Sequence, residues 1–171
     1  MINIYYSHLH KAQFLSIPKT GSTTVKASLS IDDENKYQFR DQFIYNYPCF
    51  TVIRHTYPRI ISAFHELKRS GHPRALVSFE KFIENIENFG FFDHHLHPQS
   101  WYLDKLKDKI SKIYTLENGL LDFMLDYSLP ELKIRNTTPN PPILLDKALK
   151  KKIDVLYFQD LKMYSQTAVT Y

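Results

Sequence analysis

Short apolar runs alternate with segments of helical periodicity, and this alternation limits the folds that the chain can adopt. The first run, residues 13–17, has the length of a strand and is followed by Pro18, a helix breaker. Two further runs, residues 49–54 and residues 112–116, have the same character. Strands that alternate with helices are typical of an α/β domain with a mainly parallel sheet. Because no repeat, linker or low-complexity tract divides residues 1–171, we expect a single domain.

Apolar residues at helical spacing predict five helices between and after these strands. The helices are expected to start after the turn of residues 19–24, at Pro58, after Ser78, at Leu120 and near Leu144. Proline is favoured at the first position of a helix, and serine is favoured as its cap. The last helix is expected to be long and to turn one apolar stripe inward. That stripe consists of Ile153, Leu156, Tyr157, Leu161 and Tyr164.

Composition excludes several classes of protein. An aromatic content of 15% is too high for a disordered chain, and the single Cys49 excludes a disulfide framework or a multi-cysteine zinc site. The net charge of +4 favours anionic partners. The lysines within residues 147–152 have the spacing of a solvated helix face, so we do not expect nucleic acid as a partner. No apolar run reaches the ~20 residues of a membrane span, and the N-terminus lacks a signal peptide, so we expect a cytoplasmic protein.

The turn after the first strand carries the strongest chemical signal. The chain has only 4 glycines, and Gly21 lies between a lysine and three hydroxyl residues where a helix is expected to start. Backbone N–H groups at such a corner bind anions, and glycine permits a positive φ there. The usual phosphate-loop pattern is not met, because its first glycine is missing and the lysine precedes Gly21. An ordinary turn with a Ser/Thr cap is the alternative. The candidate anion-binding residues are Lys19, Thr20, Gly21, Ser22, Thr23 and Thr24.

A second strand-to-helix corner has similar chemistry. Arg54 ends the second strand, and Ser62 lies early in the helix that follows. A guanidinium can bind a phosphate with two hydrogen bonds, although Arg54 alone is equally compatible with a carboxylate partner. Two such corners together indicate a ligand with two separated anionic groups.

Both corners resemble motifs of the carbohydrate-type sulfotransferases, the heparan- and chondroitin-like family. Residues 17–23, Ile-Pro-Lys-Thr-Gly-Ser-Thr, are similar to the family's 5′-phosphosulfate loop, and residues 52–64 are similar to its 3′-phosphate motif. The chain departs from the second motif at Thr56, where many relatives have proline, and at Pro58, where they have an acidic residue. Looser similarity covers residues 93–100, the segment around Glu117, residues 136–138 and residues 157–161.

The resemblance implies a P-loop-like, three-layer fold and a sulfuryl-transfer reaction. The donor would be 3′-phosphoadenosine-5′-phosphosulfate (PAPS; product PAP), and the acceptor a hydroxyl of a carbohydrate or glycan. By similarity, Lys19 and residues 20–24 would hold the 5′-phosphosulfate, with Lys19 also stabilising the leaving oxygen. Arg54 and Ser62 would hold the 3′-phosphate. No resident metal is expected.

The acceptor hydroxyl needs a base, and histidine has a suitable pKa. Three histidines crowd beside Asp93, and His95 aligns best with the histidine that relatives often have here. A solvated loop with incidental histidines is one alternative. Metal binding by the cluster is disfavoured, because adjacent histidines rarely face the same centre. Other candidates for the base are His97, His65 and Glu66.

Further residues and functions stay open. Trp101 and Tyr102 either stack on a sugar ring or belong to the core, and Arg135 with Asn136 matches a nucleotide-side position of relatives. A kinase with a degenerate phosphate loop is one alternative function. The order of Lys19 before the glycine and the lack of a Walker-type aspartate at an obvious strand end disfavour it. A non-catalytic nucleotide-binding protein is the other alternative.

Overall fold

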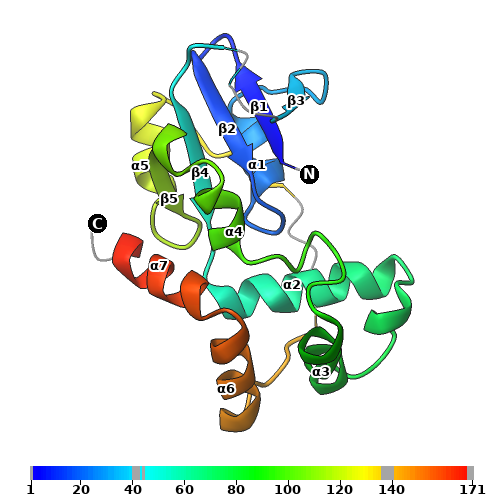
Figure 1. Ribbon diagram of the computed structural model, residues 1–171. Coiled ribbons are helices and arrows are strands. Elements are labelled where there is room, and N and C mark those ends of the chain that lie inside the picture. Colours follow the sequence, from blue (N-terminus) through cyan, green and yellow to red (C-terminus); the bar gives the residue numbers. More distant parts are fainter. Residues whose placement is uncertain (1, 40–42, 44, 136–140, 169–171) are drawn as a thin grey trace.

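The computed structural model describes residues 2–39, 43, 45–135 and 141–168, which contain a five-stranded mixed sheet flanked by helices (Figure 1). The strand order is β3-β1-β2-β4-β5. Strands β2, β4 and β5 are parallel, whereas β1 pairs antiparallel with both β2 and β3. The expected parallel arrangement therefore holds for three strands, and the sheet as a whole is mixed. The strands are β1 (Asn3–Ser7), β2 (Ala12–Ser16), β3 (Lys36–Gln38), β4 (Cys49–Ile53) and β5 (Ile110–Thr115).

Helices lie where the apolar periodicity predicts them. Ser78 caps α3 by accepting the N–H of Lys81 at 3.3 Å, as expected from the sequence. None of the described helices is long and apolar enough to cross a membrane. The helices are α1 (Ser22–Ser28), α2 (Thr56–Arg69), α3 (Phe79–Phe89), α4 (Gln99–Asp104), α5 (Leu120–Asp126), α6 (Lys147–Leu156) and α7 (Phe158–Ala168), with 3₁₀ turns η1 (Pro73–Ala75) and η2 (Lys107–Lys109).

Three expected helix boundaries differ in the structure. Helix α1 already begins at Ser22, within the segment that was expected to form the turn. Pro58 is the third residue of α2, not the first, and it is tolerated there because first-turn N–H groups have no intrahelical acceptor. The long helix expected from Leu144 is two helices, of which α6 begins after Asp146, whose side chain accepts the N–H of Leu149 at 2.7 Å. Tyr157, between the two helices, is buried, and its hydroxyl donates to the carbonyl of Leu96 at 2.8 Å.

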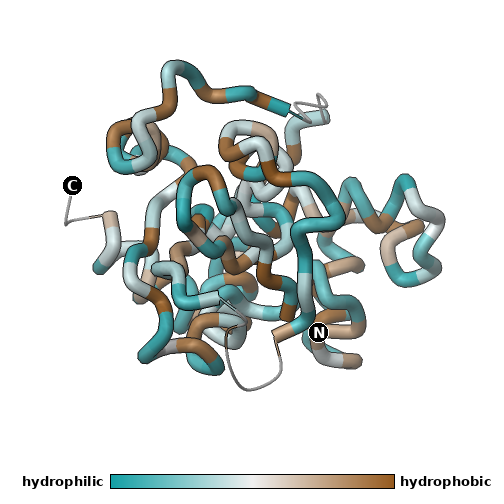
Figure 2. The backbone as a smooth tube through the Cα atoms, turned by 90° about the horizontal axis from the view of Figure 1, so that it is seen from above, coloured by the Kyte–Doolittle hydropathy of each residue, from teal (hydrophilic) through white to brown (hydrophobic). Residues whose placement is uncertain are grey.

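Three apolar clusters form the core. Along β2, Phe14 packs in a cluster with residues of α1 and α5, while its neighbour Leu15 packs in another with residues of α4 and α7. Because successive strand residues point to opposite faces, these helices cover the two faces of the sheet. The third cluster joins α2, α3 and α6, which lie beyond the end of the sheet (Figure 1). Hydrophobic and hydrophilic residues alternate along most of the chain, as these amphipathic elements require (Figure 2).

A buried ion pair connects α2 to α7. Arg59 Nη1 lies 3.9 Å from Asp160 Oδ2, and both side chains are completely inaccessible to solvent. The carboxylate of Asp160 also accepts the N–H of Gln99 at 2.8 Å and the N–H of Ser100 at 2.9 Å. Asp160 therefore caps α4 while it neutralises Arg59, and three helices depend on it.

We expect Asp160→Asn to lower the free energy of unfolding by about 3–5 kcal/mol, because the Arg59 guanidinium would stay buried without its counter-charge. Urea unfolding would measure the loss. The control, Lys81→Gln, removes the exposed ion pair of Lys81 with Glu84 and should cost less than about 1 kcal/mol. A loss for Asp160→Asn as small as that of the control would contradict the prediction.

Candidate functional site

The loop between β2 and α1 contains two residues with positive φ. Lys19 has φ 67° and Gly21 has φ 85°, so Gly21 adopts the left-handed conformation that the sequence predicts. A Cβ atom at Gly21 would lie 2.6 Å from Cδ1 of Leu116. Both the backbone angle and the close neighbour therefore favour glycine. Thr23 is exposed on the first turn of α1.

The loop engages most of its own hydroxyl groups. Thr20 and Ser22 both donate to the carbonyl of Ile17, at 2.9 and 3.0 Å. Thr24 is buried, and its hydroxyl accepts the N–H of Arg135 at 3.1 Å. These three hydroxyls stabilise the loop, so an anion at this corner would be held mainly by loop N–H groups and the lysine.

The second corner lies beside the first at the carboxyl ends of β2 and β4. The side chain of Gln99 fixes the backbone of Arg54 by accepting its N–H and donating to its carbonyl, each at 2.8 Å. Arg54 Nη1 then donates to the carbonyl of Lys19 at 3.4 Å. Arg54 Nε lies 3.8 Å from a carboxylate oxygen of Glu117 and, within the described residues, has no hydrogen-bond partner. The guanidinium thus connects the two corners and retains a buried donor.

One face of α2 is turned toward the loop between β2 and α1. Arg59 Nε donates to the carbonyl of Pro18 at 3.1 Å, and a carboxylate oxygen of Glu66 lies 3.7 Å from Nζ of Lys19. Ser62 is three residues after Arg59 and four before Glu66, which places it on this same face. Burial lowers the pKa of Lys19, and the charge of Glu66 opposes that shift. The structure therefore brings Lys19 and Arg54 together, and helical spacing places Ser62 on the face of α2 that is turned toward Lys19.

The histidine loop, residues 93–97, is held against the same region by Arg59. Arg59 Nη2 donates to the carbonyl of His97 at 2.8 Å and to the carbonyl of His95 at 3.3 Å. The pKa of Glu66 is lowered by a hydrogen bond from Arg69, and the charge of Lys19 lowers it further. Arg59 of α2 thus contacts both the histidine loop and the loop between β2 and α1.

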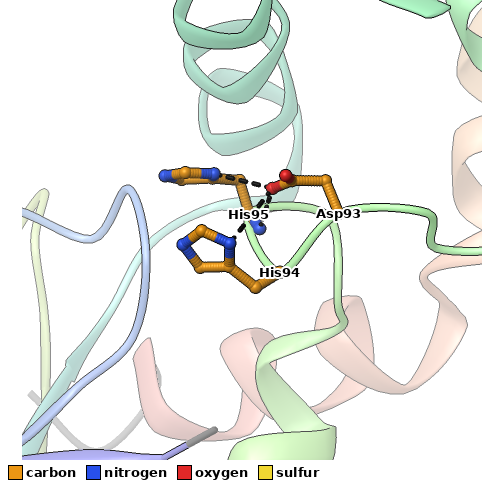
Figure 3. Close-up of side chains that lie close together, drawn as sticks. All are labelled: Asp93, His94 and His95. Carbon is orange, nitrogen blue, oxygen red and sulfur yellow. Dashed lines mark hydrogen bonds and ion pairs between the residues drawn. The ribbon is translucent and has the colours of Figure 1, made fainter. Parts of the chain in front are cut away.

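His95 is oriented by Asp93 (Figure 3). Asp93 Oδ1 lies 2.7 Å from Nδ1 of His95 and accepts the backbone N–H of the same residue at 2.8 Å. Burial alone would raise the pKa of Asp93, but these hydrogen bonds outweigh burial and lower it. An ionised carboxylate only accepts, so Nδ1 carries a proton, and in the neutral ring the lone pair is on Nε2. This tautomer is the one that a general base requires.

The other candidates for the base are engaged differently. Glu66 forms a 2.6 Å ion pair with Arg69, which keeps its carboxylate ionised and weakly basic. Burial lowers the pKa of His65, whose Nε2 is buried with no hydrogen-bond partner in the described part of the chain. The ring of His97 stacks on Trp101 with centroids 4.8 Å apart. The geometry therefore favours His95 among the four.

The two aromatic candidates belong to the protein's own packing. Tyr102 is buried, and its hydroxyl donates to the carbonyl of His94 at 2.8 Å. Trp101 has the His97 ring against it, and Nζ of Lys105 lies 3.9 Å from its ring centroid. Asn136 lies outside the described residues.

Sequence reasoning placed three residues that position the site in segments of looser similarity, but it assigned no role to them. Glu117 accepts the N–H of His55 at 3.2 Å and the hydroxyl of Tyr164 at 2.9 Å while it faces Arg54. Gln99 and Asp160 act in the same way on the backbones of β4 and α4. Each contact joins residues at least 45 positions apart, so no local pattern indicates it.

A cavity of about 390 Å³ lies between α4, β5 and α7. Leu103, Ile110, Ile113 and Met163 supply apolar walls, and none of the predicted donor residues lines it. The two candidate anion-binding corners are therefore separate from this cavity.

We expect Gly21→Ala to destabilise the fold more than Gly71→Ala does. Both glycines have positive φ, which costs a residue with a Cβ about 1–2 kcal/mol. Nothing lies within 4 Å of a Cβ at Gly71, whereas Leu116 must move at Gly21, adding roughly 1 kcal/mol. Urea unfolding of both variants would measure the difference. A Gly21→Ala loss equal to or smaller than that of Gly71→Ala would show that Leu116 imposes no constraint.

Comparison with known proteins adds no relative to this geometry. No protein-family model, curated protein or solved structure matches the chain. The function is therefore inferred from the residues and their arrangement.

Proposed function

We propose that the chain is a sulfotransferase with a P-loop-like, three-layer arrangement, which uses 3′-phosphoadenosine-5′-phosphosulfate as donor and a carbohydrate-type hydroxyl as acceptor. The observation that carries the proposal is the contact of Arg54 with the backbone of Lys19. This contact places two cationic strand-to-helix corners side by side, and ligands of α/β sheets bind at such edges. A nucleotide with anionic groups at both ends suits this pair of corners.

The chemistry of the two corners fits such a donor. Lys19 and Arg54 each have a carboxylate nearby, at 3.7 and 3.8 Å, which are distances of ion pairing without a hydrogen bond. The buried Nε of Arg54 has no hydrogen-bond partner among the described residues. Each cation thus keeps donor capacity for an anion that approaches more closely.

In this mechanism Lys19 and the loop N–H groups hold the 5′-phosphosulfate, and Arg54 with Ser62 holds the 3′-phosphate. When bound, the donor supplies an activated sulfuryl group. Lys19 neutralises the negative charge that grows on the leaving oxygen. Nε2 of His95 accepts the proton of the acceptor hydroxyl, while Asp93 keeps the ring in the required tautomer. Positioning supplies the rest of the rate enhancement, as in phosphoryl transfer.

The 3′-phosphate assignment predicts nucleotide selectivity. We expect 3′,5′-ADP to raise the melting temperature clearly, and 5′-ADP and ATP to raise it less, because a ligand stabilises the state that binds it. Arg54→Gln should weaken 3′,5′-ADP binding by roughly 10- to 100-fold, the range for a charged hydrogen bond. Arg74→Gln, on η1, is the matched control and should leave binding unchanged.

The same titration separates the alternatives. A larger shift with ATP than with 3′,5′-ADP would support a kinase and contradict the proposal. Equal shifts with all three nucleotides would remove the 3′-phosphate role of Arg54 and Ser62. Clear selectivity for 3′,5′-ADP without any transfer to glycans would indicate a non-catalytic nucleotide-binding protein.

Catalysis is tested by transfer of labelled sulfate from the donor to a panel of glycans. We expect Lys19→Ala to reduce the rate about 10²- to 10³-fold, because leaving-group stabilisation is lost. His95→Gln should reduce it about 10²- to 10⁴-fold through loss of proton transfer. His10→Gln, in the turn between β1 and β2 at the other end of β2, should have no effect. Full turnover by His95→Gln would exclude His95 as the base.

A further inference from the structure

The side chains of the histidine loop converge on one oxygen atom. Asp93 Oδ1 lies 2.7 Å from Nδ1 of His95 and 3.4 Å from Nδ1 of His94 (Figure 3). One metal-ligating atom from each of these three residues lies within 4.8 Å of the other two. Adjacent histidines rarely face one centre, which disfavours a metal at the level of sequence. In the folded loop both rings turn toward the same carboxylate, with their centroids 4.0 Å apart.

We propose that Asp93, His94 and His95 form a binding site for a divalent transition-metal ion, and that Zn²⁺ suits this ligand set. Imidazole nitrogen and carboxylate oxygen are ordinary zinc ligands, and three protein ligands leave a fourth position for water. The side chain of His94 is 62% exposed, which gives an ion a path from solvent. The ion would take the place of the proton that now lies between Asp93 and His95.

Binding of the ion would change which nitrogen of His95 carries the proton. In the metal-free loop Nδ1–H donates to Asp93, and a neutral ring then has its lone pair on Nε2. With the ion on Nδ1, that proton goes to solvent and Nε2 takes one up, so the neutral ring is conserved and no other reactant is needed. His95 can then no longer accept a proton from a hydroxyl. Zinc would therefore inhibit transfer, a consequence that rests on the proposed function, whereas the binding site does not.

The site is tested by titrating the chelator-treated full chain with Zn²⁺ in a calorimeter. We expect one equivalent to bind, and His94→Ala to weaken binding by more than about 10-fold, since even outer-shell changes have that effect. His8→Ala removes an exposed histidine of the turn between β1 and β2 and should bind as the wild type does. Circular dichroism would verify that both variants fold. Unchanged affinity in His94→Ala, or no saturable binding by the wild type, would overturn the site.

Two further readouts separate the site from its consequence. Co²⁺ in place of Zn²⁺ should give visible absorption bands of a site with nitrogen ligands, and His94→Ala should lose them. Zn²⁺ should inhibit sulfate transfer by the wild type with a midpoint near the calorimetric Kd, and chelator should restore the rate. Transfer that persists at saturating Zn²⁺ would overturn the inhibition. A wild type that never transfers sulfate would refute the proposed function, while the calorimetry would still decide the metal site.

Discussion

The candidate site depends on the hydrogen bonds and the ion pair of the Arg59 guanidinium. This guanidinium donates to the carbonyl of Pro18 on one loop and to the carbonyls of His95 and His97 on another, and Asp160 of α7 supplies its counter-charge. A buried guanidinium without these partners would cost several kcal/mol. Arg59 therefore connects the two loops directly, whereas no strand pairing among the described residues does so.

The cations of the two corners are balanced by carboxylates from helix α2 and from the turn after β5. Glu66 and Glu117 lie close enough to Lys19 and Arg54 to reduce the repulsion between these two charges. An anion that binds here must displace these carboxylates from the cations. Its net affinity is therefore its own attraction to Lys19 and Arg54 minus the attraction of the carboxylates that it displaces. Direct charge-assisted hydrogen bonds are stronger than pairs separated by 3.7 to 3.8 Å, so a phosphate that donor groups can reach would win this competition.

Sequence reasoning succeeded where structure is determined within a few residues. The positive φ of Gly21, the strand that precedes Arg54 and the capped start of α3 all follow from neighbours along the chain. Strands β1 and β3 were not predicted, because β1 depends on pairing with β2, and β3 has only three residues. Whether Lys19, Arg54 and His95 act as the resemblance implies stays a prediction, although the fold brings them together.

The roles of the residues that position the site could not be predicted from the sequence, for a different physical reason. A charged residue on an amphipathic helix ordinarily faces solvent, so Arg59 beside Ile60 gives no signal of complete burial. Its partner Asp160 is about one hundred residues away on another helix. Likewise, nothing in the neighbouring sequence indicates that the side chain of Gln99 forms hydrogen bonds with the backbone of Arg54. Such contacts are specified by the assembled fold, which local periodicity does not encode.

The carboxylate of Asp93 gives His95 two properties that cannot be separated. The hydrogen bond between Nδ1 and Asp93 fixes a proton on Nδ1, so Nε2 is the nitrogen that would accept a proton in the proposed transfer. The same anionic oxygen, together with the second ring of His94, also makes Nδ1 attractive to a cation that would replace the proton. A weaker contact with Asp93 would reduce both the orientation of the proposed base and the affinity of the proposed metal site. Only His94 distinguishes the two, because it contributes to cation binding and not to the tautomer of His95.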